Sequence, residues 1–466
     1  MVLPQPSLIA TELREKYNKQ LAWNVNSQSW YSYSTSHKGV WSIEPHELIQ
    51  RMIQAELDSK PVTATRYGSS YVSSILNLLK AYLAIRTWDE QTELIPLLNG
   101  VLDVDKKQLL PHSPTYLFTW CLPYEYDPIA TCEPIQAWLL EAMNGEQSIV
   151  ELLRAYLNTI ILSRVDLQRY LECIGPGGTG KSTYTRLAVA LVGRRNTFTT
   201  ELKQLEQNRF ESAAIYGKRL VLITDSERYG GQVSKLKALT GQDLIRYERK
   251  NQQQGDGFAS QAMVLIAANE AIQSNDYTSG LQRRRLSVPF THVPETPRDL
   301  LSLTDGNPSG EFAPYLPGLL NWVLEMPKEQ VTKLIVNAES SVPRLAAMKA
   351  KMLCDTNPIA DWVDHRVIHK PETKTYVGDK NLDKSKYLYS NYVSYCHSMR
   401  KNPVAGNRFS SLLEDLCRHQ LKLAGVEKAR DRNGAHFVNL KLREPDDSEL
   451  SPITRQLFSD GTVTEG

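Results

Sequence analysis

The sequence lacks the cysteine patterns of zinc sites and of disulfide frameworks. Its six cysteines are scattered over 466 residues, and no two of them form a C-x-x-C pair. This spacing is typical of free thiols in a reducing compartment. The amino end has no charged segment followed by an apolar core, so no secretory signal peptide is predicted. We therefore expect a cytoplasmic protein.

Long apolar runs and a strong net charge are also missing. The most apolar long stretch, 149–162, carries Glu151 and Arg154 and is too short to cross a bilayer, so no membrane partner is expected. The formal net charge is only +2, so any nucleic-acid-binding surface has to be local. A chain of this length is expected to form roughly two to four domains.

One octet carries the strongest chemical signal in the chain. Residues 175–182 read GPGGTGKS and fit G-x-x-x-x-G-K-[ST], the pattern of a phosphate-binding loop. A predicted strand over 170–174 enters it and a predicted helix over 183–192 leaves it. Glycines let successive N–H groups turn toward one anion, and the helix N-terminus adds partial positive charge. The predicted nucleotide-binding residues are Gly175, Pro176, Gly177, Gly178, Thr179, Gly180, Lys181, Ser182 and Thr183.

The chemistry of an ATPase assigns roles within and behind this loop. Lys181 is expected to reach the β- and γ-phosphates, and Ser182 to bind Mg²⁺ through its hydroxyl. Asp225 closes a predicted strand over 219–223 and is the second candidate Mg²⁺ ligand. Glu227 is the candidate base that activates water, and Asn269, after a predicted strand over 263–267, could hold that water. The predicted cofactors are ATP and Mg²⁺.

Two basic segments follow, and each can be interpreted either as a solvated charged surface or as a functional site. Arg283 and Arg284 stand before a strand-like run that ends at 290, either as a solvated basic edge or as an arginine finger that stabilises phosphoryl-transfer charge in a neighbouring subunit. Residues 245–257 predict a hairpin whose tip carries Arg249 and Lys250. That tip is charged either for solubility or for contact with DNA.

The remaining chain predicts two flanking units. Residues 1–45 predict a helix and an aromatic-rich sheet, whose rings we expect in the core rather than stacked on bases, and 46–95 predict helices. A short strand is expected over 116–120. At the other end, three helices and an Asn-Gly hairpin over 357–443 outline a winged helix-turn-helix. Its cations suggest either a duplex-binding footprint or a solvated surface, and they are Arg408, Arg418, Lys422, Lys428, Arg430 and Arg432.

The ordered set of motifs resembles the superfamily 3 helicases, in the branch of the poxvirus and phage/plasmid primase–helicases. Segments 99–103 and 123–128 are similar to the helicase-preceding domain of that branch, and 357–443 is similar to its C-terminal winged helix. Two positions depart from the family pattern: Gln282 replaces an aromatic residue, and Asn251 a histidine-like one. The matching motifs are 175–182, 225–227, 236–241, the strand that ends at Asn269, and Arg283-Arg284 before 288–290.

The resemblance implies a P-loop, AAA+-like α/β ATPase that works as a ring, usually a hexamer, on single-stranded DNA. Arg284, and with it Arg283, would then act on the nucleotide of the neighbouring subunit, and Arg249 and Lys250 would line the pore. The given sequence has no room for the large primase domain often fused to such helicases, so we expect either a separate primase or polymerase as a partner or a longer protein of which this sequence is a part. The predicted domains are an α+β domain (1–133), a helical collar (134–168), the ATPase with its helical lid (169–353), the winged helix (355–444) and a disordered tail (445–466).

The predicted function is therefore that of an ATP-dependent DNA helicase of a mobile element or viral-type replication system, acting on single-stranded and forked DNA. One alternative is a DNA-binding replication initiator or loader that uses ATP as an assembly switch and unwinds little. Another is a monomeric P-loop kinase, which predicts neither an oligomer nor hydrolysis stimulated by DNA.

Overall fold

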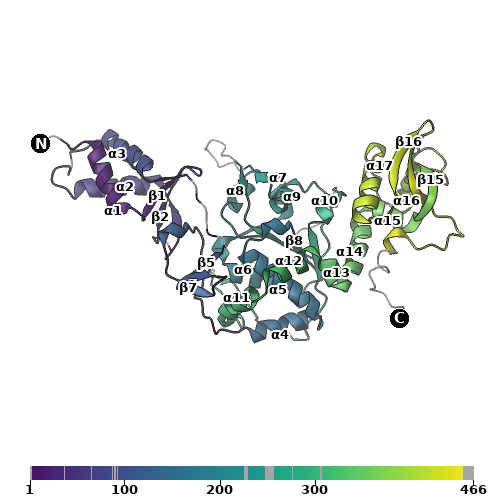
Figure 1. The fold of residues 1–466 in the computed structure, drawn as a ribbon, viewed down its shortest axis with the longest axis horizontal. Coiled ribbons are helices and arrows are strands. Elements are labelled where there is room, and N and C mark those ends of the chain that lie inside the picture. The colour runs from purple at the N-terminus through teal and green to yellow at the C-terminus, as the bar shows by residue number, and fades with distance from the viewer. Residues whose placement is uncertain are drawn as a thin grey trace.

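The computed structural model describes residues 3–454 apart from 36, 65, 87, 89–90, 92, 225–228, 247–256, 275, 297 and 305–306. In Figure 1 the chain is elongated, with an amino-terminal unit at one end, an α/β domain in the middle and a carboxy-terminal unit at the other end. Across the described residues, no helix combines the length and the hydropathy that a membrane crossing requires.

The amino-terminal unit packs three helices on a four-stranded sheet of order β3-β2-β1-β4. Trp30, Tyr31 and Trp41 are buried, which confirms that these aromatic rings serve the core. The predicted helical run over 46–95 ends at Tyr82, where the chain turns into a short strand. The elements are α1 (Pro6–Tyr17), β1 (Leu21–Asn24), β2 (Ser29–Tyr33), β3 (Trp41–Glu44), α2 (His46–Asp58), α3 (Ser69–Tyr82) and β4 (Ala84–Ile85).

A three-stranded antiparallel sheet, β5 (Leu94–Leu97), β6 (Gly100–Asp103) and β7 (Gln108–Leu110), follows the first unit. Its buried side chains belong to the same core as the central domain, and that core continues across residue 133. The strand predicted over 116–120 is wrong. Leu117 adopts a left-handed conformation (φ 57°), which interrupts the extended chain, although Phe118 and Trp120 are still buried.

The central domain is built on five parallel strands in the order β14-β8-β13-β10-β9, which confirms the predicted α/β class. β8 lies inside the sheet, and the strand that follows it along the chain lies at the far edge. Because parallel strands are covered by helices on both faces, the sequences of β10 and β13 are almost entirely apolar. The strands are β8 (Tyr170–Ile174), β9 (Thr197–Thr200), β10 (Leu220–Thr224), β13 (Met263–Ala268) and β14 (Arg285–Pro289).

Alternate residues of these strands enter two separate cores. Leu171 and Cys173 face one core, and Val221 and Ile223 face the other. The first core is covered by α4 (Glu133–Ala142), α5 (Gln147–Ile161), α6 (Lys181–Val192), α11 (Leu316–Leu324), α12 (Lys328–Val336) and α13 (Ala338–Ser341). The second is covered by α7 (Leu202–Gln207), α8 (Glu211–Ile215), α9 (Ser234–Gly241) and α10 (Ser279–Gln282). Between α9 and β13, β11 (Leu244–Ile245) pairs antiparallel with β12 (Phe258–Ala259), which fits the predicted hairpin.

A buried ion pair joins β8 to β14. Glu172 is fully buried, and its carboxylate lies 3.4 Å from Nε of Arg285 while it accepts a hydrogen bond from the Ser287 hydroxyl (2.9 Å). Burial lowers the pKa of the Arg285 guanidinium, but Glu172 and Tyr170 raise it by more, so the arginine stays charged. The pair also clamps Ile272, whose N–H donates to Glu172 (2.7 Å) and whose carbonyl accepts from Arg285 (2.7 Å). Removing one partner of such a pair typically costs about 3–5 kcal/mol.

The carboxy-terminal unit contains three helices and a three-stranded antiparallel sheet of order β15-β17-β16. The three helices and the Asn433-Gly434 hairpin were predicted, whereas β15 was not. α14 (Pro343–Thr356) connects this unit to the central domain, and a short π-helical segment, Leu416–Gln420, continues α17. The elements are α15 (Pro358–Arg366), β15 (Val367–Tyr376), α16 (Leu388–Ser398), α17 (Gly406–Asp415), β16 (Glu427–Asp431) and β17 (Gly434–Leu442).

The prediction that the tail is disordered from residue 445 is wrong for its first ten residues. Ile453 is buried in the core of the carboxy-terminal unit, and Ser451 donates a hydrogen bond to Asp364. Basic groups hold the acidic part, because Lys370 pairs with Glu449 (3.2 Å) and Lys441 with Asp447 (3.1 Å). A polar composition therefore does not prevent order where the neighbouring sheet supplies the opposite charge. Residues 455–466 lie outside the described residues.

Candidate nucleotide-binding site

The Gly175–Ser182 loop leaves the carboxyl end of β8 and becomes the first turn of α6, as its sequence predicts. Gly178 (φ 79°) and Gly180 (φ 93°) adopt left-handed conformations, which glycine takes at little cost. The first N–H groups of a helix have no acceptor within it, and those of α6 open toward the loop. The fold therefore provides a concentration of N–H donors suited to a phosphate group.

Lys181 lies on this loop rather than in bulk solvent. Its side chain is mostly buried, and Nζ donates to the carbonyl oxygens of Gly175 and Pro176, at 2.6 Å each. Burial lowers the pKa of its ammonium group. The Thr179 hydroxyl also donates to the Pro176 carbonyl (2.9 Å), which closes the loop around the lysine. A positive charge is thus fixed beside the N–H groups.

A cavity of about 1160 Å³ opens above the loop, and it is large enough for a nucleoside triphosphate. Exposed Ser182, at the end of the loop, and exposed Asn269 both line it. So does Thr224, the last residue of β10 and the one that precedes Asp225. The hydroxyl and amide oxygens around the cavity are suitable ligands for Mg²⁺ or for water bound to it.

Strand register explains why Asn269 meets the loop. Ala268 of β13 pairs with Ile174 of β8, and the Gly175 N–H donates to the Ala268 carbonyl (3.3 Å). Asn269 therefore leaves its strand beside the start of the loop. The clamp on Ile272 by Glu172 and Arg285 holds the segment that follows.

Four predicted residues cannot be placed. Asp225, Glu227, Arg249 and Lys250 lie outside the described residues. Their assignment as Mg²⁺ ligand, base and DNA contacts stays a prediction.

The three consecutive arginines occupy three different environments. Arg283 is exposed, Arg284 is half-buried, and Arg285 is buried in the ion pair with Glu172. The Arg284 carbonyl accepts from the Tyr170 N–H (2.9 Å), and its Nη1 donates to the Gly280 carbonyl (2.7 Å). Burial and the neighbouring charge of Arg283 lower the pKa of Arg284. Arg285 thus belongs to the core, whereas the guanidinium groups of Arg283 and Arg284 are at least partly accessible to a ligand or a partner.

Arg284 and the Gly175–Ser182 loop lie at opposite ends of the parallel strands. β14 runs parallel to β8 with Arg285 beside Tyr170 and Pro289 beside Ile174, so Arg284 precedes the strands and the loop follows them. Five strand residues span about 17 Å. That separation is longer than an arginine side chain, so Arg284 cannot reach a phosphate on its own loop.

Some residues around the cavity have no sequence motif. Trp138 and Glu141 of α4 line it, together with His292 and Arg298, and the Trp138 ring lies against Gly180 of the loop. Glu141 pairs with Arg298 (3.2 Å) and lies 3.5 Å from the His292 ring nitrogen. The sequence predicts a helix here but gives no spacing that brings these residues to the loop, so sequence reasoning missed them. The sequence does offer a signal for the buried ion pair with Arg285: Glu172 is a charged residue inside an otherwise apolar strand.

Replacing Gly175 by alanine is expected to distort the loop. A Cβ there would overlap the Phe290 carbonyl oxygen, and the residue has φ 153°, which alanine rarely adopts. We expect loss of nucleotide binding and a lower melting temperature, measured by fluorescence titration and thermal unfolding. At Gly177 a Cβ would meet no described atom within 4 Å, so Gly177→Ala is the control for stability. Equal melting temperatures for the two variants would contradict this account of the loop.

Two family models match separate parts of the chain. One, described as "D5 N terminal like", matches residues 10–144. The other, described as a family of unknown function, DUF5906, matches residues 173–285. The first covers the segments that resemble a helicase-preceding domain. The second begins in β8 and ends at Arg285, and therefore contains the loop, Asn269 and Arg284.

Among curated proteins, the uncharacterized mitochondrial protein ymf20 of Marchantia polymorpha is 26% identical over 138 residues, which are 30% of this chain and 81% of that protein. The uncharacterized mitochondrial protein ymf21 of the same organism is 26% identical in an alignment 155 residues long that covers 30% of this chain and 86% of that protein. Among solved structures, the C-terminal region of NrS-1 aligns with a TM-score of 0.49 at 12% identity, over 94% of this chain and 99% of that one.

Proposed function

We propose that this protein is an ATP-dependent DNA helicase of a mobile element or viral-type replication system, which acts as a ring of identical subunits on single-stranded DNA. The observation that carries the proposal is the arrangement of one parallel sheet. The Gly175–Ser182 loop, with its fixed lysine, lies at the carboxyl ends of the strands, and Arg284 lies at their amino ends. The two family matches support the proposal, because one covers the Gly175–Ser182 loop and the chain as far as Arg285, and the other covers most of the domain expected before it.

In this proposal the loop holds ATP. The N–H groups at the start of α6 and the Lys181 ammonium bind the phosphates, Ser182 and Asp225 hold Mg²⁺, and Asn269 orients water that Glu227 activates. Bound Mg²⁺ supplies charge neutralisation on the phosphates. The cavity, the exposed Ser182 hydroxyl and the register that brings Asn269 beside Gly175 support these roles.

The same proposal requires a second subunit. Stabilising the charge of phosphoryl transfer needs a cation at the transferred phosphate, and Arg284 cannot reach the loop of its own chain. In a ring assembled head to tail, the amino ends of the strands in one subunit face the carboxyl ends of the strands in the next subunit. Arg284, aided by Arg283, then completes the neighbour's site.

The carboxy-terminal unit is proposed to be a winged helix that contacts duplex DNA near the fork. Its three helices and three-stranded sheet support this assignment, and its exposed edge strand β16 carries Lys428 and Arg430. Cations on an exposed edge bind phosphates without selecting a base sequence. The same surface favours the alternative of an initiator or loader that binds duplex DNA and unwinds little.

Strand displacement on a forked DNA separates these two functions. We expect the unaltered protein to release the displaced strand with ATP, and Glu227→Gln to bind nucleotide yet release at least about a hundredfold more slowly, because the base is lost. Glu311→Gln, a change at an exposed carboxylate, is the control. If the unaltered protein and Glu227→Gln release strand equally slowly while both retain duplex binding, the motor is refuted and the loader is favoured.

A further inference from the structure

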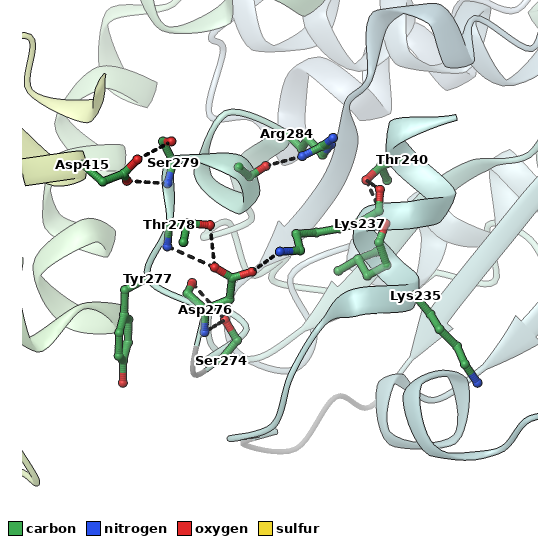
Figure 2. Close-up of polar contacts among 12 residues, drawn as sticks. Lys235, Lys237, Thr240, Ser274, Asp276, Tyr277, Thr278, Ser279, Arg284 and Asp415 are labelled. Carbon is green, nitrogen blue, oxygen red and sulfur yellow. Dashed lines mark hydrogen bonds and ion pairs between the residues drawn. The ribbon is translucent and has the colours of Figure 1, made fainter. Parts of the chain in front are cut away.

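The segment 276–284 contacts two other parts of the protein within nine residues. At its start, Asp276 pairs with Lys237 of α9 (2.5 Å). In its middle, Tyr277 packs against the core of the carboxy-terminal unit. At its end stands Arg284, after the short helix α10. Figure 2 shows that these contacts lie close together, between α9 and the carboxy-terminal unit.

Helix α10 is too short to hold its own position. It has four residues, and a single helical turn is unstable without external contacts. The residue before it, Thr278, makes no side-chain hydrogen bond to the free N–H groups of the turn. Thr278 instead donates its hydroxyl to Asp276 (2.6 Å). Something else must therefore satisfy the amino end of α10.

Asp415, at the carboxyl end of α17, supplies that contact from the carboxy-terminal unit. One carboxylate oxygen accepts from the Ser279 N–H (2.7 Å), and the other accepts from the Ser279 hydroxyl (2.8 Å) (Figure 2). Gln420 supports it by donating to Asp415 (3.0 Å) and to the Tyr277 carbonyl (3.2 Å). A two-point contact to a carboxylate fixes direction as well as distance.

The same turn of α10 holds the guanidinium of Arg284. The Gly280 carbonyl, one residue after the contact of Asp415, accepts from Arg284 Nη1 (2.7 Å) (Figure 2). On the far side, a Cβ at Gly241 would lie 2.9 Å from Arg284 Nη2, so the guanidinium sits against bare backbone of α9. The Arg284 Nε is buried without a hydrogen-bond partner among the described residues. This guanidinium is therefore located by main-chain atoms of α10 and has an unused donor.

We propose that Asp415 is a positioning residue for Arg284, so that the carboxy-terminal unit of each subunit sets the arginine that completes the neighbour's ATP site. The inference rests on the proposed function and extends it. Asp415 holds Ser279, Ser279 and Gly280 belong to one turn, and Gly280 holds Arg284. A duplex that shifts α17 on binding moves this turn, so DNA contact and hydrolysis are coupled.

The test uses the full chain with Asp415→Ala, measured as ATP turnover with forked DNA. We expect turnover at saturating ATP to fall about tenfold or more, since preorganisation of a charged donor is lost, with the nucleotide Kd unchanged. Glu414→Ala is the matched control, because Glu414 is adjacent on α17 and pairs only with the exposed side chain of Arg418 (3.2 Å) among the ion pairs described. If Asp415→Ala melts early, Ser279→Ala removes only the hydroxyl contact and is expected to give a smaller loss of the same kind.

Mixing experiments distinguish positioning from a merely structural role. Subunits with Asp415→Ala keep an intact loop, so mixing them with Lys181→Ala subunits is expected to restore turnover. Mixing them with Arg284→Ala subunits is expected to restore none, because both variants lack a working arginine. If Asp415→Ala turns over ATP as fast as the unaltered protein, or is rescued by Arg284→Ala, the inference is overturned. If Arg284→Ala itself is unimpaired, the proposed function fails instead.

Discussion

Replacing Lys181 by alanine is expected to abolish ATP hydrolysis. The ammonium group is already held at the loop by two carbonyl oxygens at 2.6 Å, which leaves one of its three N–H donors for a phosphate. Removing one preorganised donor at a reacting centre typically costs about 100- to 1000-fold in rate, and a full positive charge is expected to reach the upper end. Phosphate release by the purified protein, with and without single-stranded DNA, measures the effect.

The control for this variant is Lys203→Ala, which removes an exposed lysine from α7 and is expected to leave turnover unchanged. The melting temperature of Lys181→Ala should stay close to that of the unaltered protein, because the hydrogen bonds of this ammonium group to described residues are made with carbonyls of its own loop. Hydrolysis within a few-fold of the unaltered rate in Lys181→Ala would show that the loop is not the site of phosphate chemistry.

Replacing Arg284 by alanine is expected to lower turnover by about 1000-fold, the usual contribution of an arginine supplied to a neighbouring site. Nucleotide binding should be retained, because the Arg284 side chain and the loop of the same chain lie at opposite ends of the strands. Arg283→Ala is expected to lose less, since Arg283 is exposed and lacks the hydrogen bond that fixes Arg284 on Gly280. Turnover and fluorescent-nucleotide titration measure the two effects separately, with Arg51→Ala as a surface control.

A larger loss in Arg283→Ala than in Arg284→Ala would shift the role to the neighbouring arginine. Loss of nucleotide binding in Arg284→Ala would contradict the geometry, because it would require the arginine to act within its own chain.

The sequence predicted those parts of the site that depend on neighbouring residues. The Gly175–Ser182 loop could be predicted because its strand, glycines and helix are contiguous, and hydrophobic patterning predicted the strands that end at Thr224 and Ala268. Strand order could not be predicted in this way. Since β13 enters between β8 and β10, Asn269 stands directly beside Gly175, and this follows only from the register of the sheet.

Contacts between distant residues account for what sequence reasoning missed. Arg283, Arg284 and Arg285 are consecutive, and the sequence does not distinguish their roles. Arg285 differs because it pairs with buried Glu172, which lies 113 positions earlier in the chain (285 − 172). Asp415 and Ser279 are 136 positions apart, and neither carries a motif. The order found after residue 445 depends in the same way on basic residues of the neighbouring sheet, Lys370 and Lys441.

The central claim is that each ATP site is shared by two subunits. Its most direct test mixes Lys181→Ala with Arg284→Ala protein, each inactive alone, and measures ATP turnover across mixing ratios. At equal amounts, about a quarter of the head-to-tail interfaces combine an intact loop with an intact arginine, so we predict partial recovery that peaks near this ratio. A mixture that stays inactive at every ratio, from variants that form the same ring as the unaltered protein, would contradict the account.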